Sequence, residues 1–264
     1  MRHLIYLLIL AIISCNNQQQ KVDNSSTTTS NALANTKAQS KNEICWIGTL
    51  NGQTPVFIHY QLDNSLIIGE IIYLNTKDKL PIKLLGTIEE DKSYRLLEFD
   101  NTGNITGIIE GNPSAKRFNG SWISPRTKRE LIMRLTFKDT LINCPDIKPD
   151  ESQIFGNYHY QYGENGYNGD FDISKVGKDK IHFHILSLTN VDRGPNIAEV
   201  EKDTIEIKGN NFIYRIPGSD SCEFKTTFYK GFIYINYTKS YCESQFGLKL
   251  SLHYIHGPTA PLRG

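Results

Sequence analysis

Short runs of alternating apolar and polar residues, each ended by a turn-forming cluster, constrain the fold of this chain more than any other feature. From Ile44 onward such runs follow one another, separated by Gly, Asn, Asp or Lys. A period of two places the apolar side chains on one face of a strand, and no window shows the 3.6-residue period of a helix. The pattern therefore predicts an all-β protein built from consecutive antiparallel strands.

The first group of runs lies within residues 43–144. Turn signals such as Asn51-Gly52 and Asp63-Asn64-Ser65 favour tight hairpins between neighbouring runs. Closing such a meander into a barrel removes its exposed edges, and about eight strands suffice. We therefore expect residues 43–144 to form an eight-stranded β-meander or barrel domain. The predicted strands are Ile44–Leu50, Pro55–Leu62, Leu66–Leu74, Pro81–Ile88, Ser93–Phe99, Ile105–Glu110, Arg117–Ile123 and Leu131–Phe137.

A second group of runs follows a break at residues 145–153. Pro145 and Pro149 stop any strand from continuing there, which favours a linker. Residues 154–264 are then expected to form a second antiparallel all-β domain, barrel-like or a curled sheet. Its predicted strands are Phe155–Tyr162, Asp170–Val176, Lys180–Leu188, Ala198–Glu201, Thr204–Lys208, Asn211–Ile216, Cys222–Tyr229, Phe232–Tyr237 and Phe246–Ile255.

The first 14 residues have the layout of an export signal. Arg2 and His3 form a short basic region, and the apolar run Leu4–Ile13 is too short to span a bilayer. Ile12-Ile13-Ser14-Cys15 resembles the lipobox of bacterial lipoproteins. This resemblance implies removal of residues 1–14, a lipid on Cys15 and an anchor in the membrane. The alternative is an ordinary secretory signal with a chance cysteine.

A polar tether is expected after the lipidation site. Residues 15–42 are mostly Asn, Gln, Ser, Thr, Lys and Ala, and such a stretch buries too little apolar surface to order itself. Asn16 occupies the position where, in lipoproteins of two-membrane bacteria, aspartate commonly means inner-membrane retention. The resemblance therefore implies a location in the cell envelope, on the outer membrane if the bacterium has two.

Four cysteines remain after Cys15, and an even number in an exported protein indicates disulfides. Three connectivities are possible. We expect Cys45–Cys144 and Cys222–Cys242, because each pair then lies inside one predicted domain. Four buried thiols are the alternative, and zinc is disfavoured because no C-x₂₋₄-C pair occurs.

Two short motifs resemble avidin-like and lipocalin-like barrels. Trp46 stands on the first predicted strand, Gly120-Ser121-Trp122 stands near the end of the barrel, and Thr106-Gly107 resembles the Thr-Gly pairs of those families. In those families the tryptophans stack on a ligand or plug a barrel end. Trp46 and Trp122 are therefore candidate binding residues, with plain core positions as the alternative.

The opening of the second domain offers a further candidate surface. Tyr158, Tyr160, Tyr162 and Tyr167 lie in a tract that also holds Asn, Asp, Glu and Gly. Ring faces beside hydrogen-bonding groups are suited to a glycan or a peptide. Core tyrosines followed by a hairpin loop are the alternative. Gly156-Asn157-Tyr158 and Phe246-Gly247 also resemble uncharacterised bacterial envelope proteins, a resemblance that implies no activity.

His182 and His184 form the most metal-like pattern in the sequence. Residues two apart on a strand share a face, so both imidazoles point the same way. They are a weak candidate for a zinc or copper site, and a solvent-facing pair opposite the core is the alternative. No third ligand can be named, so we expect neither a metal nor another cofactor.

The function class follows from the anchor and from what the sequence lacks. The net charge of +1 argues against nucleic-acid partners. The chain has no nucleophile elbow, zincin motif, P-loop or dinucleotide fingerprint. We therefore expect a non-catalytic envelope lipoprotein that binds a glycan, a peptide or an envelope protein. A structural or inhibitory lipoprotein that docks to a protein partner is the alternative, and an unrecognised hydrolase is a third.

Overall fold

The computed structural model describes residues 43–189, 196–218, 222–238 and 252–256. These residues form strands joined by turns and loops, together with one short 3₁₀ helix, η1 (Glu151–Gln153). The first eight strands are β1 (Ile44–Leu50), β2 (Thr54–Asp63), β3 (Leu66–Tyr73), β4 (Pro81–Ile88), β5 (Tyr94–Phe99), β6 (Asn104–Pro113), β7 (Arg117–Ile123) and β8 (Glu130–Phe137).

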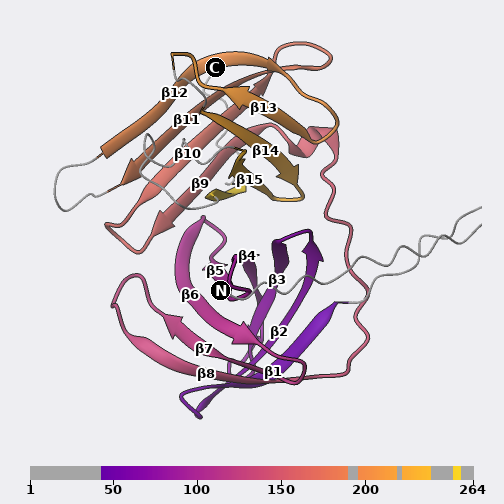
Figure 1. Cartoon of the computed structure of the whole chain (residues 1–264), viewed down its shortest axis with the longest axis vertical. Helices are drawn as coiled ribbons and strands as arrows, with labels where there is room; N and C mark the ends of the chain where they lie inside the picture. The colour runs from indigo at the N-terminus through magenta and orange to yellow at the C-terminus, as the bar shows by residue number, and fades with distance from the viewer. Residues whose placement is uncertain (1–42, 190–195, 219–221, 239–251, 257–264) are drawn as a thin grey trace, which may run out of the picture. The chain divides into compact units, whose positions relative to one another are not determined.

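These eight strands form a closed antiparallel barrel. Each strand pairs with the next along the chain, and β8 also pairs with β1. The closing register runs from Trp46 opposite Phe137 to Leu50 opposite Met133. The strand order can be followed in Figure 1 from β1 to β8. The predicted meander and its closure are confirmed.

Turn chemistry helps to set the register. Asn51 and Gly52 both adopt positive φ, 50° and 70°, which suits the tight turn between β1 and β2. Asn51 also exchanges two hydrogen bonds with Ile132 of β8, one through its backbone N–H and one through its side-chain oxygen, at 2.8 and 2.9 Å. One turn residue therefore connects the first hairpin to the strand that closes the barrel.

The barrel interior is filled by alternate residues of its strands, as a small barrel requires. Val56, Ile58 and Tyr60 of β2 point inward, whereas Phe57 and His59 between them point outward. The buried interior cluster comprises Trp46, Leu50, Val56, Ile58, Tyr60, Ile67, Ile71, Leu84, Leu96, Ile109, Phe118, Met133 and Leu135.

The remaining strands form a second antiparallel sheet, which confirms the predicted fold class of this part. Its pairing order is β12-β11-β10-β9-β16-β15-β14-β13. The strands are β9 (Gly156–Tyr162), β10 (Asn168–Lys175), β11 (Lys180–Thr189), β12 (Asn196–Glu206), β13 (Asn211–Arg215), β14 (Glu223–Tyr229), β15 (Phe232–Tyr237) and β16 (Leu252–His256).

One predicted break between two strands is absent. Ala198–Glu201 and Thr204–Lys208 were expected as separate strands, but a single strand, β12, runs through both. The register against β11 shifts between Phe183 and Ile185, which is a β-bulge. Extra residues accommodated in a bulge interrupt the alternation without ending the strand, which explains the apparent break.

Buried aromatic residues dominate the core of the second sheet. Phe171 and Phe183 stack with centroids 6.0 Å apart, and Phe183 also contacts Phe212 and Tyr214. A short parallel pairing of Asn104 and Ile105 of β6 with Gln161 and Tyr162 of β9 joins this sheet to the barrel. The division into domains at residues 145–153 stays a prediction.

The expected disulfide between Cys45 and Cys144 is absent; both are thiols. The Cys45 thiol donates to the backbone oxygens of Glu43 and Thr140, at 3.9 and 3.7 Å. The segment after β8 runs antiparallel to the start of β1: the Glu43 N–H donates to the Ile142 oxygen, and Cys45 lies beside Thr140. Cys144 is four residues beyond Thr140, which is roughly 13 Å along an extended chain. A disulfide needs Cα atoms within about 7 Å.

Several predictions fall on residues outside those described. They concern the signal and lipidation site at Cys15, the tether 15–42, and Cys242 as the partner of Cys222. Cys222 itself is buried in the second sheet. These predictions stand as expectations.

Replacing Trp46 with Ala should destabilise the barrel strongly. The Trp46 side chain is 4% exposed, packs against the rings of Phe118 and Phe137, and donates its indole N–H to the Tyr60 hydroxyl at 3.3 Å. A buried Trp→Ala change costs about 3–5 kcal/mol. Urea denaturation followed by circular dichroism should show this loss, and Ile132→Ala, at a residue that is 56% exposed, should cost under about 0.5 kcal/mol. Equal losses would contradict the assignment of Trp46 to the core.

Candidate functional site

One end of the barrel carries a cavity of about 440 Å³. It lies where β3 and β5 end and where β4 and β6 begin, beneath the connections 74–80 and 100–103. We call this end the barrel mouth. It is lined by Tyr73, Thr76, Lys77, Asp78, Lys79, Leu80, Pro81, Ile82, Glu98, Phe99, Asp100, Asn101 and Thr106.

A buried carboxylate lies at the base of the barrel mouth. Glu98 of β5 follows Leu96 with the period of a strand, so its side chain points into the barrel, and the residue is 4% exposed. The Tyr73 hydroxyl and the Trp122 indole N–H donate to Oε2 of Glu98, at 2.8 and 3.1 Å. The Thr106 hydroxyl donates to Oε1 at 2.6 Å. Three neutral donors from three strands therefore hold the carboxylate.

A β-bulge brings the Thr106 hydroxyl to this position. In the pairing of β5 with β6, Glu98 lies opposite Gly107 while Phe99 lies opposite Ile105, so Thr106 is the extra residue. A bulge re-aims one side chain without breaking the sheet. Thr106 consequently donates to its cross-strand neighbour Glu98.

Gly107 makes room for the indole of Trp122. A Cβ atom on Gly107 would lie 2.1 Å from Nε1 of Trp122, well inside van der Waals contact. The absence of a side chain at Gly107 therefore lets the indole lie against β6 and reach Glu98.

Burial, followed by the charge and the hydrogen bond of Glu98, raises the pKa of the Tyr73 hydroxyl. Tyr73 therefore stays a neutral donor at physiological pH.

At the rim of the barrel mouth, the Asp100 carboxylate accepts hydrogen bonds from Thr102 and Asn104 within its own turn. Partial burial raises the pKa of Asp100, but these hydrogen bonds outweigh it and hold the pKa below its usual value. Asp100 is thus committed to shaping the turn.

The predicted tryptophan candidates lie at opposite ends of the barrel. Trp122 belongs to the barrel mouth, and its polar edge contacts Glu98. Trp46 is at the beginning of β1, in contact with Phe118, Phe137 and Tyr60, and fills the other end. Trp46 therefore serves in core packing, whereas Trp122 does not line the cavity itself but holds Glu98, which does.

Most of the tyrosine candidates serve in the second core. Tyr158 and Tyr160 are buried, and their hydroxyls contact the Ile154 backbone oxygen and the Ser187 hydroxyl, each at 2.8 Å. Tyr162 is half-buried on the same face of β9, and only Tyr167 is as much as 42% exposed. These four side chains do not line the barrel mouth.

His182 and His184 share the outer face of β11, as predicted, while Phe183 between them is buried. The ring of His182 contacts the Thr204 hydroxyl at 2.6 Å, and that of His184 contacts the Glu199 carboxylate at 2.8 Å. Within the described residues, no three His, Cys, Asp or Glu side chains are grouped to hold a metal ion.

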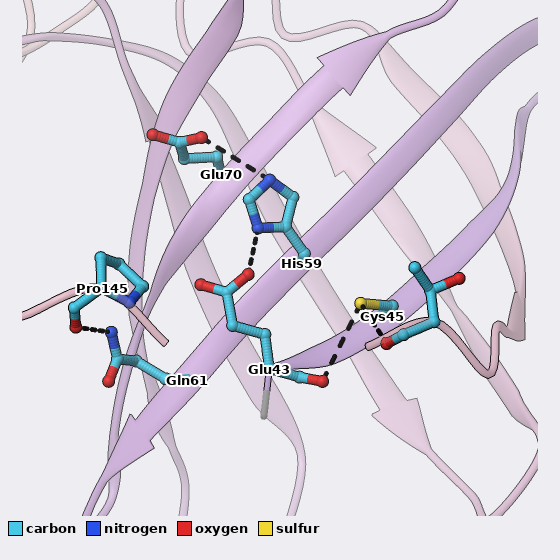
Figure 2. Close-up of polar contacts among 7 residues, drawn as sticks. Glu43, Cys45, His59, Gln61, Glu70 and Pro145 are labelled. Carbon is cyan, nitrogen blue, oxygen red and sulfur yellow. Dashed lines mark hydrogen bonds and ion pairs between the residues drawn. The ribbon is translucent and has the colours of Figure 1, made fainter. Parts of the chain in front are cut away.

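A second polar cluster lies on the outer face of β1–β3 (Figure 2). Cys45, His59 and Glu70 occupy one cross-strand row. The ring of His59 lies between Glu43 and Glu70, with nitrogen–oxygen distances of 2.5 and 3.6 Å. Gln61 donates to the backbone oxygen of Pro145 at 3.0 Å, which ties the chain after β8 to β2.

This cluster has the residue types of a cysteine nucleophile site but not its arrangement. The Cys45 thiol donates to backbone oxygens rather than to His59, and the residue is 1% exposed. Burial, with a contribution from the Glu43 charge, raises the pKa of Cys45, whereas a nucleophile needs a lowered value. We therefore assign this cluster to fastening residues 138–145 against the barrel.

Sequence reasoning missed Glu98 as a site residue. The alternation alone does not place its side chain, because both faces of this strand are apolar: Leu96 shares the face of Glu98, and Leu97 and Phe99 form the other. A charged residue at an inward position of a barrel strand requires partners. Thr106 comes from the neighbouring strand, whereas Tyr73 and Trp122 come from β3 and β7, each two strands away, so their contacts with Glu98 follow only from the curled barrel.

Comparisons of the chain with protein-family models, with curated proteins and with solved structures give no match. Among the described residues, no helix has the length and apolar character needed to cross a membrane.

Gly107→Ala should displace the indole of Trp122 from Glu98, because the added methyl carbon overlaps Nε1. Two indole N–H signals are expected in a ¹H–¹⁵N spectrum, one for each tryptophan, and the variant should shift that of Trp122 much more than that of Trp46. Gly177→Ala is the matched control, because its methyl carbon makes an ordinary contact at 3.7 Å. An unchanged Trp122 signal in the Gly107→Ala variant would refute the packing described here.

Proposed function

We propose that this chain is a lipid-anchored binding protein of the bacterial envelope whose barrel mouth receives a small polar ligand without catalysing a reaction. The anchor part of the proposal is supported by the lipobox-like sequence that ends at Cys15. The binding part is supported by the barrel mouth, where a cavity meets a buried hydrogen-bonding group.

The observation that carries the proposal is Glu98 at the base of the cavity. Ligand pockets have volumes of about 300–1,000 Å³ and few, precisely placed polar groups, and they occur in the mouths of β-barrels. At about 440 Å³ the barrel mouth lies in that range, and Glu98, Tyr73 and Thr106 are among its lining residues. A closed eight-stranded barrel is wide enough to hold one small ligand, as in the avidin-like and lipocalin-like families that the tryptophan motifs resemble.

The hydrogen bonds of Glu98 favour binding over catalysis. General acid–base catalysis requires a group that releases and takes up a proton at the reacting atom. The Glu98 carboxylate instead accepts from three fixed neutral donors, and burial keeps Tyr73, the titratable one among them, protonated. Such an arrangement orients an acceptor toward a ligand.

A ligand screen by NMR tests the proposed function. Amino acids, short peptides, sugars and cell-wall fragments are added to the labelled protein one class at a time. We expect at least one class to shift the signals of residues 73–82, 98–106 and the Trp122 indole together. Binding that shifts only signals of the second sheet, or no binding by any class, would contradict the proposal.

Two variants that add the same side-chain volume at opposite ends of the barrel test whether the ligand binds in this cavity. Asn101→Trp places a large ring at the rim and should weaken binding at least tenfold. Lys116→Trp adds the same ring to an exposed turn at the other end of the barrel and should leave the affinity unchanged. Equal affinity in the two variants would place the binding site elsewhere.

Cys15→Ser tests the anchor independently of the ligand. Serine cannot accept the thioether-linked lipid, so the variant should be released when membranes are washed, whereas the wild-type protein should need detergent. Mass spectrometry of the wild-type protein should show an acylated Cys15 as its first residue. Identical extraction of both proteins would remove the lipoprotein part of the proposal.

A further inference from the structure

The charge balance of the barrel mouth specifies the ligand further. We propose that the barrel mouth selects ligands carrying a primary ammonium group, which contacts the Glu98 carboxylate. This inference rests on the proposed function, because it names the chemical class of ligand for the same cavity.

Among the residues that the structure describes, Glu98 has hydrogen-bond partners but no counter-charge. Its three donors, Tyr73, Thr106 and Trp122, are all neutral. Throughout the described ranges, no Lys, Arg or His nitrogen lies within 4.0 Å of a Glu98 oxygen. Buried charges in proteins are usually paired, and an unpaired one gains most from an incoming opposite charge.

The other charged residues around the cavity offset one another. Lys77 and Lys79 in the β3–β4 connection are exposed, and so is Asp78 between them. Asp100 is the fourth charged residue of the rim, and it is already hydrogen-bonded within its turn. Lys77 and Lys79 balance Asp78 and Asp100, so these four lining residues carry no net charge. Adding Glu98 gives the lining of the cavity a net charge of −1.

The carboxylate retains capacity for a further donor. An ionised carboxylate offers about four acceptor sites and no donor. Oε2 accepts two hydrogen bonds and Oε1 accepts one from a side chain, that of Thr106. A neutral hydroxyl could occupy a remaining site without balancing the charge, and an anionic group would be repelled. An ammonium group supplies both a donor and the missing charge.

Three probes of similar shape test this selection. Cyclohexylammonium, cyclohexanol and cyclohexanecarboxylate are titrated into the full-length mature protein, and the shift of the Trp122 indole signal gives each dissociation constant. We expect the ammonium probe to bind about tenfold or more tightly than the alcohol, because both donate to the carboxylate but only the ammonium also balances its charge. The carboxylate should bind weakest.

Variants test whether Glu98 is the residue responsible for the preference for ammonium over alcohol. Glu98→Gln should remove the preference for ammonium over alcohol, while Glu90→Gln, which removes one exposed charge at the other end of the barrel, should retain it. Should Glu98→Gln fold poorly, Thr106→Val offers a second readout, because it deletes one donor but keeps the charge and should preserve the preference.

The outcomes are distinguishable from those of the ligand screen. Equal affinity for ammonium and alcohol, tighter binding of the carboxylate, or no binding of any probe each overturns the selection of ammonium. The small-ligand function is judged separately by the ligand screen, which includes uncharged compounds. A preference for ammonium that survives in Glu98→Gln also overturns the inference.

Discussion

The pairing of β1 with β8 is the interaction on which the rest of the structure depends. It turns a meander with two open edges into a tube that has an interior and two ends. Trp46 fills one end with aromatic contacts. At the other end the interior meets a cavity, and the inward side chain of Glu98 lines it while hydrogen-bonded to three neighbours. Thr106 faces Glu98 across the β5–β6 pairing in any case, but Tyr73 of β3 and Trp122 of β7 lie two strands away and reach Glu98 because the sheet curls into a barrel.

Local departures from regular strand geometry build the barrel mouth. The bulge at Thr106 turns one hydroxyl toward Glu98, and Gly107 next to it admits the Trp122 indole. Each costs some sheet regularity, and together they supply two of the three hydrogen bonds that hold a buried carboxylate. Natural proteins tend to break local rules at functional sites, so these irregularities coincide with the proposed site for a physical reason.

Strand alternation and turn residues were sufficient to predict the fold, because both act locally. The eight barrel strands and the Asn51-Gly52 turn follow directly from the sequence. Contacts between distant strands could not be predicted in this way. The pairing of residues 138–142 with β1 separates Cys144 from Cys45, and alternation alone left open whether Tyr158 and Tyr160 point into a core or onto a binding surface. Trp122 was identified from a short motif, whereas its partner Glu98 becomes significant only once the barrel is closed.

Native-state hydrogen exchange of the wild-type protein, measured by NMR, tests most directly the claim that a closed barrel holds an ordered network in its mouth. In a closed barrel, amides shared between β1 and β8 should exchange as slowly as those between β2 and β3. The indole proton of Trp122, held by Glu98, should be protected with them. Fast exchange along the β1–β8 pairing, or an unprotected Trp122 indole beside slowly exchanging strands, would contradict this claim.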